Sequence, residues 1–413
     1  MRTRADQTRV LIAGGGVAAL EAALALRALA EERVSVELVG PEPHFWYRPL
    51  SVAEPFELGE AQSFELSKLA LAAGATFSLG TLMGVDSKRH EAHTSVGDLP
   101  YDVLLIACGA TPTPALPGAL TFRGPADADK IRALLAEIVA GTVRRVAFVV
   151  PSGAVWSLPI YELALMTAAY VQEHQIEHAE ITLVTPEDQP LGLFGDDAAD
   201  AVRELLDERR IAVRAGTHAA EIVAGELRFI ASGHCEVDRV VALPRLHGPG
   251  LDGVPQNLDG FIPVDNHGRV RGLADVFAAG DITSFPVKQG GIAAQQAYAV
   301  AEFIAAGVDA KPEPKPFRPV LRGLLLTGRQ PRYLRHELTG GSGPSSSVSP
   351  EPLWWPPGKI VGRYLAPFLA SVAGVDPPAA PKAPGLPVEI DVDMDAMPGF
   401  SQEARRTNSG PGL

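Results

Sequence analysis

The sequence predicts an α/β fold with two Rossmann-like domains and a small C-terminal module. Three observations support this prediction. A strand, a glycine-rich turn, a helix and a second strand follow one another near the N-terminus. A similar unit recurs further along the chain, and the composition changes after residue 307. Repeated units of this kind favour two parallel sheets rather than a single domain.

The first unit begins with a short apolar run over residues 9–13, which three glycines interrupt at 14–16. Residues 17–30 are rich in alanine and leucine at helical spacing, and residues 34–39 form a second apolar run. A strand, turn, helix and strand within about 30 residues predict a βαβ unit with parallel strands.

The second unit has the same order, with a strand over 146–150, a helix over 158–172 and a strand over 181–185. The two units end alike, in Leu-Val-Gly-Pro-Glu at 38–42 and Leu-Val-Thr-Pro-Glu at 183–187, an offset of 145 residues. We therefore predict an internal repeat of two nucleotide-type domains.

Composition excludes several classes of function. A net charge of −13 over 413 residues disfavours nonspecific binding to nucleic acid or anionic lipid. Cys108 and Cys235 are the two cysteines, too few for a disulfide framework or a cysteine-based metal site. No apolar run reaches the roughly 18 residues of a membrane-spanning helix. We expect a cytoplasmic protein without a metal site, and peripheral membrane contact stays open.

The glycine turn has the spacing G-x-G-x-x-A, in which backbone N–H groups at a helix N-terminus approach a pyrophosphate. The residues of this turn are Gly14, Gly15, Gly16, Val17, Ala18 and Ala19. The motif also needs a carboxylate after the second strand to hold ribose hydroxyl groups. Gly40 occupies the expected position, so we favour Glu42 over Glu37, with a solvated loop acid as the alternative for Glu42.

Two later segments complete a family pattern: Tyr-Asp-Val-Leu-Leu-Ile-Ala-Cys-Gly-Ala-Thr-Pro at 101–112 and Ala-Asp-Val-Phe-Ala-Ala-Gly-Asp at 274–281. With them the chain resembles the FAD-dependent pyridine nucleotide–disulfide oxidoreductase superfamily. The resemblance implies FAD contacts at Cys108, Gly109, Gly280 and Asp281, with Asp281 accepting hydrogen bonds from the ribityl chain. Cys108 replaces a threonine that this family usually carries.

Residues 285–297 form a polar, glycine-rich opening to an alanine-rich helix, and they are similar to a stretch in sulfide:quinone reductases and type II NADH dehydrogenases. Such a helix start directs a positive dipole at the flavin. The candidates here are Lys288 for charge and Gln289, Gly290 and Gly291 for cofactor contact. The quinone motif Ala-Gln-x-Ala-x-Gln begins correctly at 294 but ends in Ala299.

The identity of the electron donor stays open. The segment 45–50, which includes the cofactor candidate Arg48, has no cysteine pair for a flavin-linked dithiol, and the two cysteines do not match those of sulfide:quinone reductases. The second-domain turn at 151–156 has a single glycine. Glu162 matches a family glutamate near the nicotinamide, and Glu187 would favour NAD over NADP. The alternative is that this domain is a structural relic.

The resemblance divides the chain into an FAD-binding domain at 1–115 and 246–310 and an NAD(P)-binding-like domain at 116–245. A C-terminal module is expected at 311–375, with linker-like composition at 310–316 and 340–347, and a disordered tail at 376–413. The module carries an aromatic cluster at 353–355, which we expect to pack it in place rather than to line a quinone or membrane site. Its five arginines between 318 and 335 are expected to lie on solvated strand faces, with a lipid or acidic-partner site as the alternative.

The predicted function is that of an FAD-dependent oxidoreductase, in which NAD(P)H or another two-electron donor reduces the flavin and a quinone or other acceptor reoxidises it. Small-molecule donors and acceptors are the expected partners, and a homodimer is common among relatives. Two alternatives stay open: a sulfide:quinone-reductase-like enzyme acting on a sulfur substrate, and a non-catalytic flavin-dependent redox-sensing module.

Overall fold

The computed structural model describes residues 7–310, 313–338 and 346–374. Its first sheet has five parallel strands in the order β20-β9-β1-β2-β5. These strands are β1 (Thr8–Ala13), β2 (Val34–Gly40), β5 (Thr76–Leu79), β9 (Val103–Ile106) and β20 (Val276–Ala278). The central strand β1 buries both faces, which explains its continuous apolar run.

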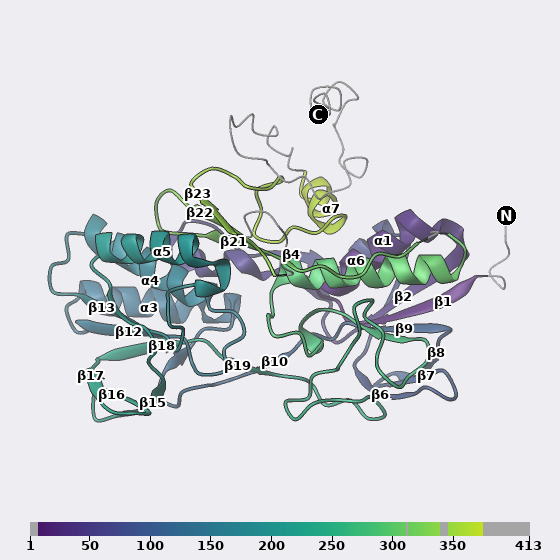
Figure 1. Ribbon diagram of the computed structural model, residues 1–413, viewed down its shortest axis with the longest axis horizontal. Coiled ribbons are helices and arrows are strands. Elements are labelled where there is room, and N and C mark those ends of the chain that lie inside the picture. The colour runs from purple at the N-terminus through teal and green to yellow at the C-terminus, as the bar shows by residue number, and fades with distance from the viewer. Residues whose placement is uncertain (1–6, 311–312, 339–345, 375–413) are drawn as a thin grey trace, which may run out of the picture.

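Two alanine-rich helices, α1 (Val17–Ala30) and α6 (Gly290–Gly307), lie side by side on one face of this sheet (Figure 1). Small side chains let their backbones approach closely. The short helix α2 (Leu66–Ala72) completes this layer. The other face is covered by an antiparallel meander of β6 (Leu82–Asp86), β7 (Glu91–Thr94) and β8 (Gly97–Pro100).

The second domain repeats this plan, which confirms the predicted α/β fold with two Rossmann-like domains. Its parallel sheet has the order β11-β18-β12-β13-β14. The strands are β11 (Leu120–Thr121), β12 (Arg145–Val149), β13 (Glu180–Val184), β14 (Ala212–Arg214) and β18 (Arg239–Ala242). The helices are α3 (Ala128–Val139), α4 (Leu158–Glu173) and α5 (Asp196–Glu208). A second meander comprises β15 (Ala219–Val223), β16 (Glu226–Phe229) and β17 (His234–Glu236).

The chain passes between the two domains in a two-stranded antiparallel connection, β10 (Thr111–Thr113) with β19 (Arg245–His247). A second small ribbon, β3 (His44–Tyr47) with β4 (Gln62–Glu65), follows the first βαβ unit. The chain leaves the first domain after β9 and returns to it before β20. The first sheet therefore contains strands that precede the second domain in sequence and one that follows it.

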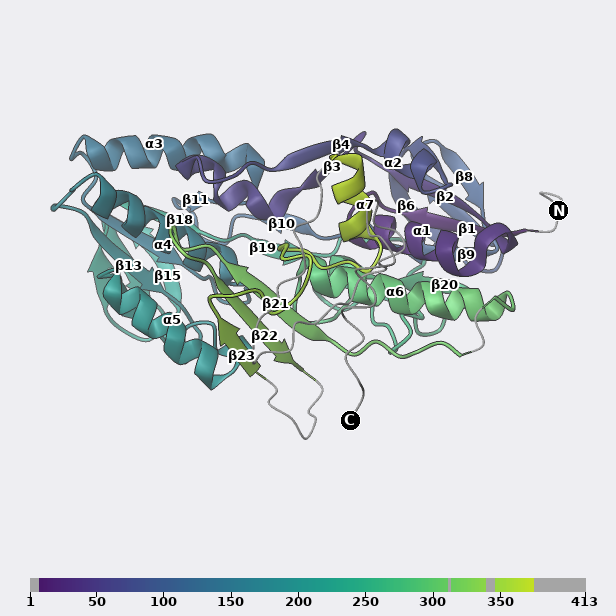
Figure 2. The same ribbon diagram turned by 90° about the horizontal axis from the view of Figure 1, so that it is seen from above.

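The C-terminal module is an antiparallel sheet of β21 (Val320–Leu325), β22 (Arg332–Glu337) and β23 (Ser346–Ser349), followed by α7 (Leu365–Val372). This sheet crosses over the junction of the two domains (Figures 1 and 2). Ser346 and Ser347 belong to β23, which corrects their assignment to a linker, because pairing with β22 orders them. Three other parts of the expected linkers and tail lie outside the described residues. They are 311–312, 340–345 and 376–413.

The aromatic cluster of the module is internal. Trp354 and Trp355 are both buried, and Tyr333 meets the Trp354 ring edge-on at 5.1 Å between centroids. The Trp354 indole N–H donates to the Gly358 carbonyl at 3.0 Å. These contacts agree with the expected packing role. In the described part of the chain, no helix combines the length and apolarity needed to cross a membrane.

Candidate functional site

The glycine turn between β1 and α1 has two glycines required by packing and one that faces open space. A Cβ atom on Gly14 would lie 2.2 Å from the Ala107 carbonyl oxygen, and one on Gly15 would lie 2.5 Å from a Leu66 methyl group. Gly16 is the N-cap of α1, and a Cβ placed there meets no atom within 4 Å. The turn therefore brings an accessible helix N-terminus to the end of β1, as an anion such as a pyrophosphate requires.

Asp281 lies beside this turn. It belongs to the short 3-10 helix Gly280–Ile282, and a Cβ on Gly280 would come within 3.1 Å of the Ala18 Cβ in the first turn of α1. The close approach brings the late motif against the glycine turn. Gln296 fixes it further, since its side-chain oxygen accepts from the Gly280 N–H at 2.8 Å.

The Asp281 carboxylate has no hydrogen-bond partner among the described residues. Burial raises its pKa, while the charges of Lys288 and Arg48 act in the opposite direction. Asp281 is partly exposed and lines the interdomain pocket, where a ligand can supply the missing donors. Its position therefore suits a ligand that carries hydroxyl groups.

Cys108 and Gly109 follow β9, next to the glycine turn. The Cys108 thiol donates to the Ala13 carbonyl at 3.4 Å, and burial raises the pKa of Cys108 to about 12. A thiol with so high a pKa is protonated at neutral pH and is a poor nucleophile. Gly109 has a φ of +74°, a conformation that favours glycine, so the strand ends in a sharp turn.

The two carboxylates considered for the ribose differ in their contacts. Glu37 accepts a hydrogen bond from the Ser78 hydroxyl at 2.9 Å on the neighbouring strand. Glu42 lies just past the end of β2, is exposed, and has no side-chain partner within the described residues. A Cβ on Gly40 would lie 3.4 Å from the Gly15 nitrogen, so the expected position has little room for a side chain. Glu42 stays the better placed candidate.

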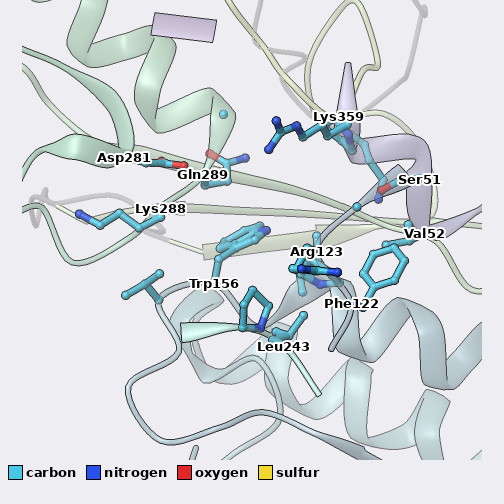
Figure 3. Close-up of a pocket in the computed structure, with 18 of the residues that line it drawn as sticks. Ser51, Val52, Phe122, Arg123, Trp156, Leu243, Asp281, Lys288, Gln289 and Lys359 are labelled. Atoms are coloured by element: carbon cyan, nitrogen blue, oxygen red, sulfur yellow. The ribbon is translucent and has the colours of Figure 1, made fainter. Parts of the chain in front are cut away.

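A pocket of about 290 Å³ lies between the two domains and beneath the C-terminal module. In Figure 3, Asp281, Lys288 and Gln289 lie on one side of Trp156, and Arg123 and Leu243 lie on the other. Further predicted residues that line this pocket are Arg48, Glu162 and Gly290. The pocket thus joins the Asp281 region to the second domain.

Lys288 is buried and its ammonium group is held by its own loop. Nζ donates to the carbonyl oxygens of Thr283 and Phe285, the latter at 2.8 Å, and lies 3.9 Å from the centre of the Phe261 ring. Burial lowers the pKa of Lys288 to about 8, while Asp281 opposes this change. Lys288 therefore shapes the loop before α6 and places positive charge near Asp281.

Gln289 is the N-cap of α6. Its side-chain oxygen accepts from the Ile292 N–H at 2.9 Å, and its side-chain nitrogen donates to the Arg322 carbonyl of β21 at 3.0 Å. A Cβ on Gly290 would lie 2.9 Å from Ile360, so this glycine lets the C-terminal module approach the helix start. The amide of Gln289 is thus engaged in capping, and Gly290 is required by packing. A Cβ on Gly291 would meet only the Gln289 side chain, at 3.0 Å.

Glu162 of α4 forms a buried ion pair with Lys359 of the C-terminal module. The Lys359 Nζ lies 2.6 and 2.7 Å from the two carboxylate oxygens, and the Leu326 N–H also donates to Glu162 at 2.8 Å. Burial raises the pKa of Glu162 and lowers that of Lys359, and their mutual attraction opposes both changes. The pair forms part of the pocket wall.

The second-domain turn differs in length from the first. Three residues join β1 to α1, whereas eight residues, 150–157, join β12 to α4. The longer loop reaches the first domain, where the Val155 carbonyl accepts from the Lys288 N–H at 3.4 Å. The G-x-G-x-x-G frame therefore does not apply to 151–156, because the helix begins later than that frame requires. Trp156 of this loop projects into the pocket (Figure 3).

Glu187 is engaged within its own domain. Its carboxylate accepts from the hydroxyl groups of Ser157, Tyr161 and Thr185 at 2.8, 2.5 and 2.8 Å. A carboxylate offers roughly four acceptor positions. Three of them already hold the loop and the start of α4, so Glu187 has one position left for a ribose hydroxyl.

The pocket residues that were not predicted as site residues include Trp156, Arg123 and Lys359. Trp156 occupies the position at which a G-x-G-x-x-G turn would carry its final glycine. This difference from the motif was the sequence signal that could have identified Trp156 as a pocket residue. Lys359 lies nearly two hundred residues from Glu162, in a segment without a motif. Arg123 forms an ion pair with the buried Asp127, which gives the sequence no functional signature.

The described residues fit FAD at two points. The open helix N-terminus at Gly16 suits the pyrophosphate, and the unpartnered Asp281 suits ribityl hydroxyl groups. The remaining contacts predicted for Glu42, Arg48 and Cys108 stay predictions.

Comparison with known proteins gives a consistent result. Residues 8–301 match the pyridine nucleotide-disulphide oxidoreductase family. The ferredoxin reductase component of chlorobenzene dioxygenase from Cupriavidus sp. (strain PS12) is 28% identical over 328 residues, covering 73% of this chain and 74% of that protein.

Among solved structures, sulfide:quinone oxidoreductase from Aquifex aeolicus superposes with a TM-score of 0.76 at 19% identity, over 83% of this chain and 86% of that one. NDH2 from Plasmodium falciparum superposes with a TM-score of 0.64 at 15% identity, over 81% and 92%. These likenesses concern the fold. From the family match over residues 8–301, the chain belongs to the pyridine nucleotide-disulphide oxidoreductase family and is an FAD-dependent oxidoreductase.

Proposed function

We propose that the chain accepts electrons from a reduced pyridine nucleotide in the interdomain pocket and passes them through FAD to a quinone or other acceptor. One observation carries the proposal. The pocket is lined by Asp281 and Lys288 of the first domain and by Trp156 and Glu162 of the second. A donor held by the second domain would therefore meet the cofactor held by the first.

The chain's own residues would bind and orient the reactants. The isoalloxazine ring supplies the two-electron chemistry when FAD is bound. Gly16 and Asp281 would hold the cofactor. The N-terminus of α6, capped by Gln289, and the buried ammonium of Lys288 would favour negative charge on the ring side of the site. The C-terminal sheet contributes Arg322 and Leu324 of β21 to the pocket wall.

A second candidate is a smaller two-electron donor, such as a sulfur compound. Two features favour it: the loop at 150–157 carries Trp156 into the pocket, and three hydroxyl groups already occupy most acceptor positions of Glu187, which leaves fewer contacts for a dinucleotide. Neither Cys108 nor Cys235 is activated as a thiolate, since desolvation raises the pKa of both thiols. Such a donor would have to react directly with the cofactor.

Anaerobic stopped-flow absorbance with NADH, NADPH and sulfide in turn separates the candidates. Loss of the flavin absorption band with NADH or NADPH supports the proposal, whereas rapid loss with sulfide alone supports the smaller donor. Slow reduction by all three would contradict both and favour a redox-sensing role.

Replacement of Trp156 sharpens this test. If a pyridine nucleotide is the donor, Trp156→Ala opens the pocket and lowers KM for NADH by about tenfold, equivalent to about 1.4 kcal/mol. Ile230→Ala, an exposed position in the same domain, is the matched control and leaves KM unchanged. An unchanged KM for NADH in Trp156→Ala would place the nucleotide outside this pocket.

A further inference from the structure

A second recess, distinct from the interdomain pocket, lies where α4 and α5 end beneath the C-terminal module. Its volume is about 330 Å³, and it shares no lining residue with the interdomain pocket. Three arginines line it: Arg209 at the C-cap of α5, Arg329 from the connection between β21 and β22, and Arg332 at the start of β22. Segments far apart in sequence thus bring three positive charges together.

None of the three guanidinium groups forms an ion pair with a carboxylate of the described residues. The protein has 49 acidic and 36 basic residues, so acidic partners are abundant. Nearby arginines form ion pairs with such residues: Arg203 on α5 pairs with Asp200 at 2.5 Å, and Arg335 on β22 pairs with Glu337 at 2.6 Å. The lack of ion pairs is therefore specific to the arginines of the recess and is not shared by arginines on the same elements.

Arg209 is the least accessible of the three, with 8% of its surface exposed. Its single side-chain hydrogen bond, to the Gln172 side-chain oxygen, is long at 3.4 Å. Burial lowers the pKa of Arg209, and the charges of Arg329 and Arg332 lower it further, against Glu208 and Glu173. A guanidinium group enclosed in this way is costly without a counter-charge.

The segment that presents the other two arginines is internally fixed. The buried Thr327 hydroxyl donates to the Gln330 carbonyl at 3.0 Å and accepts from the Arg329 N–H at 3.2 Å. The Arg332 guanidinium donates to the carbonyl oxygens of Gln330 and Pro331 at 3.3 and 3.2 Å. Because carbonyl groups are neutral, these bonds leave its positive charge uncompensated. Preorganised donors of this kind bind an oxyanion at a low entropic cost.

Two features partly offset the positive charge. Glu208 lines the same recess, although it is exposed and forms no ion pair there, and the recess lies at the C-terminal ends of α4 and α5, where the helix dipoles are negative. Three arginines outnumber the two nearby acids, Glu208 in the lining and Glu173, whose charge also acts on Arg209, so the recess is net positive. Guanidinium groups match the geometry of phosphate oxygens better than ammonium groups do.

We propose that this recess is a binding site for a phosphate-type oxyanion, held by Arg209, Arg329 and Arg332 and separate from the flavin chemistry. The recess accommodates a phosphate group with a small attached moiety. The same phosphate chemistry is also present in lipid headgroups, so the experiment has one arm for each source.

The first arm is thermal unfolding of the FAD-loaded full-length protein with increasing inorganic phosphate, against chloride at matched ionic strength. We expect a saturable rise of about 3 °C in Tm. Arg329→Gln, an exposed position, should abolish the rise. In phosphate-free buffer the Tm of this variant should be no lower than that of the parent, because the substitution removes a charge that repels the other two arginines. Arg203→Gln is the control and keeps the response.

The second arm is flotation with vesicles containing phosphatidylglycerol, with the same variants. Flotation that Arg329→Gln abolishes, without a Tm response to inorganic phosphate, assigns the phosphate group to lipid. A phosphate response that is identical in the parent and in Arg329→Gln, or no response in either arm, overturns the proposal. A lower Tm of Arg329→Gln in phosphate-free buffer would also overturn it, since the arginine would then be structural.

Discussion

At the residue scale, Asp281 is the feature that most directly points to a bound cofactor. Ordinary interior carboxylates in this protein are satisfied: Asp127, for example, is fully buried and accepts from Arg123 and Lys130. Asp281 has two cations nearby but accepts no hydrogen bond among the described residues. Asp281 is partly exposed to the pocket, so the fold presents an acceptor that a ligand entering the pocket can use.

Replacing Asp281 with alanine should weaken FAD binding by about 10- to 100-fold, since a hydrogen bond to a charged group contributes roughly 1.5–3 kcal/mol. The ratio of flavin to protein absorbance after gel filtration measures this loss. Asp129→Ala, an exposed position on α3, is the matched control. Full flavin content in Asp281→Ala would remove Asp281 from the cofactor site.

At the element scale, the two strand-to-helix connections show how one architecture serves two purposes. The three-residue connection places a helix N-terminus directly at the end of β1, and it needs glycine because the backbone of Ala107 and the side chain of Leu66 lie against it. The eight-residue connection carries Trp156 out to the domain junction instead. The first connection leaves a helix N-terminus open to an anion such as a pyrophosphate, and the second one lines a pocket.

Substitutions in the first turn should separate folding from binding. Gly14→Ala places a methyl group against the Ala107 carbonyl at a φ of +145°, so we expect a loss of at least about 2 kcal/mol in the unfolding free energy of the apoprotein. Gly16→Val fills open space and should leave apoprotein stability unchanged while lowering FAD occupancy. Urea unfolding of both apoproteins and flavin titration test this. Equal effects of the two substitutions on stability would contradict it.

At the scale of the whole molecule, the buried pair of Glu162 and Lys359 joins the second domain to the C-terminal module. Further contacts tie this module to the first domain, where the Glu21 carboxylate accepts from the Leu365 N–H at 2.8 Å and the Tyr47 hydroxyl accepts from the Ile360 N–H at 3.1 Å. The module therefore holds the two domains in the arrangement that forms the pocket.

Removing one partner of this pair should cost far more than removing both. Glu162→Gln leaves the Lys359 ammonium buried without a counter-charge, and we expect a loss of about 3–5 kcal/mol in unfolding free energy. Glu162→Gln combined with Lys359→Met should lose less than the sum of the single losses. Urea unfolding of the FAD-loaded proteins measures the coupling. Lys68→Met, which removes an exposed pair with Glu65, is the control, and additive losses would show that the pair is not coupled.

Sequence by itself determined the two parallel sheets, the glycine turn and the position of Asp281 at a strand end. These features depend on local periodicity and on short-range backbone constraints, which a chain displays directly. The tertiary structure decided the rest: the pairing of Glu162 with Lys359, the binding of three hydroxyl groups by Glu187, the engagement of Lys288 and Gln289 in capping their own loop and helix, and the convergence of three arginines in one recess. Each of these joins segments distant in sequence, and side-chain partners at such range depend on how the domains pack rather than on local pattern.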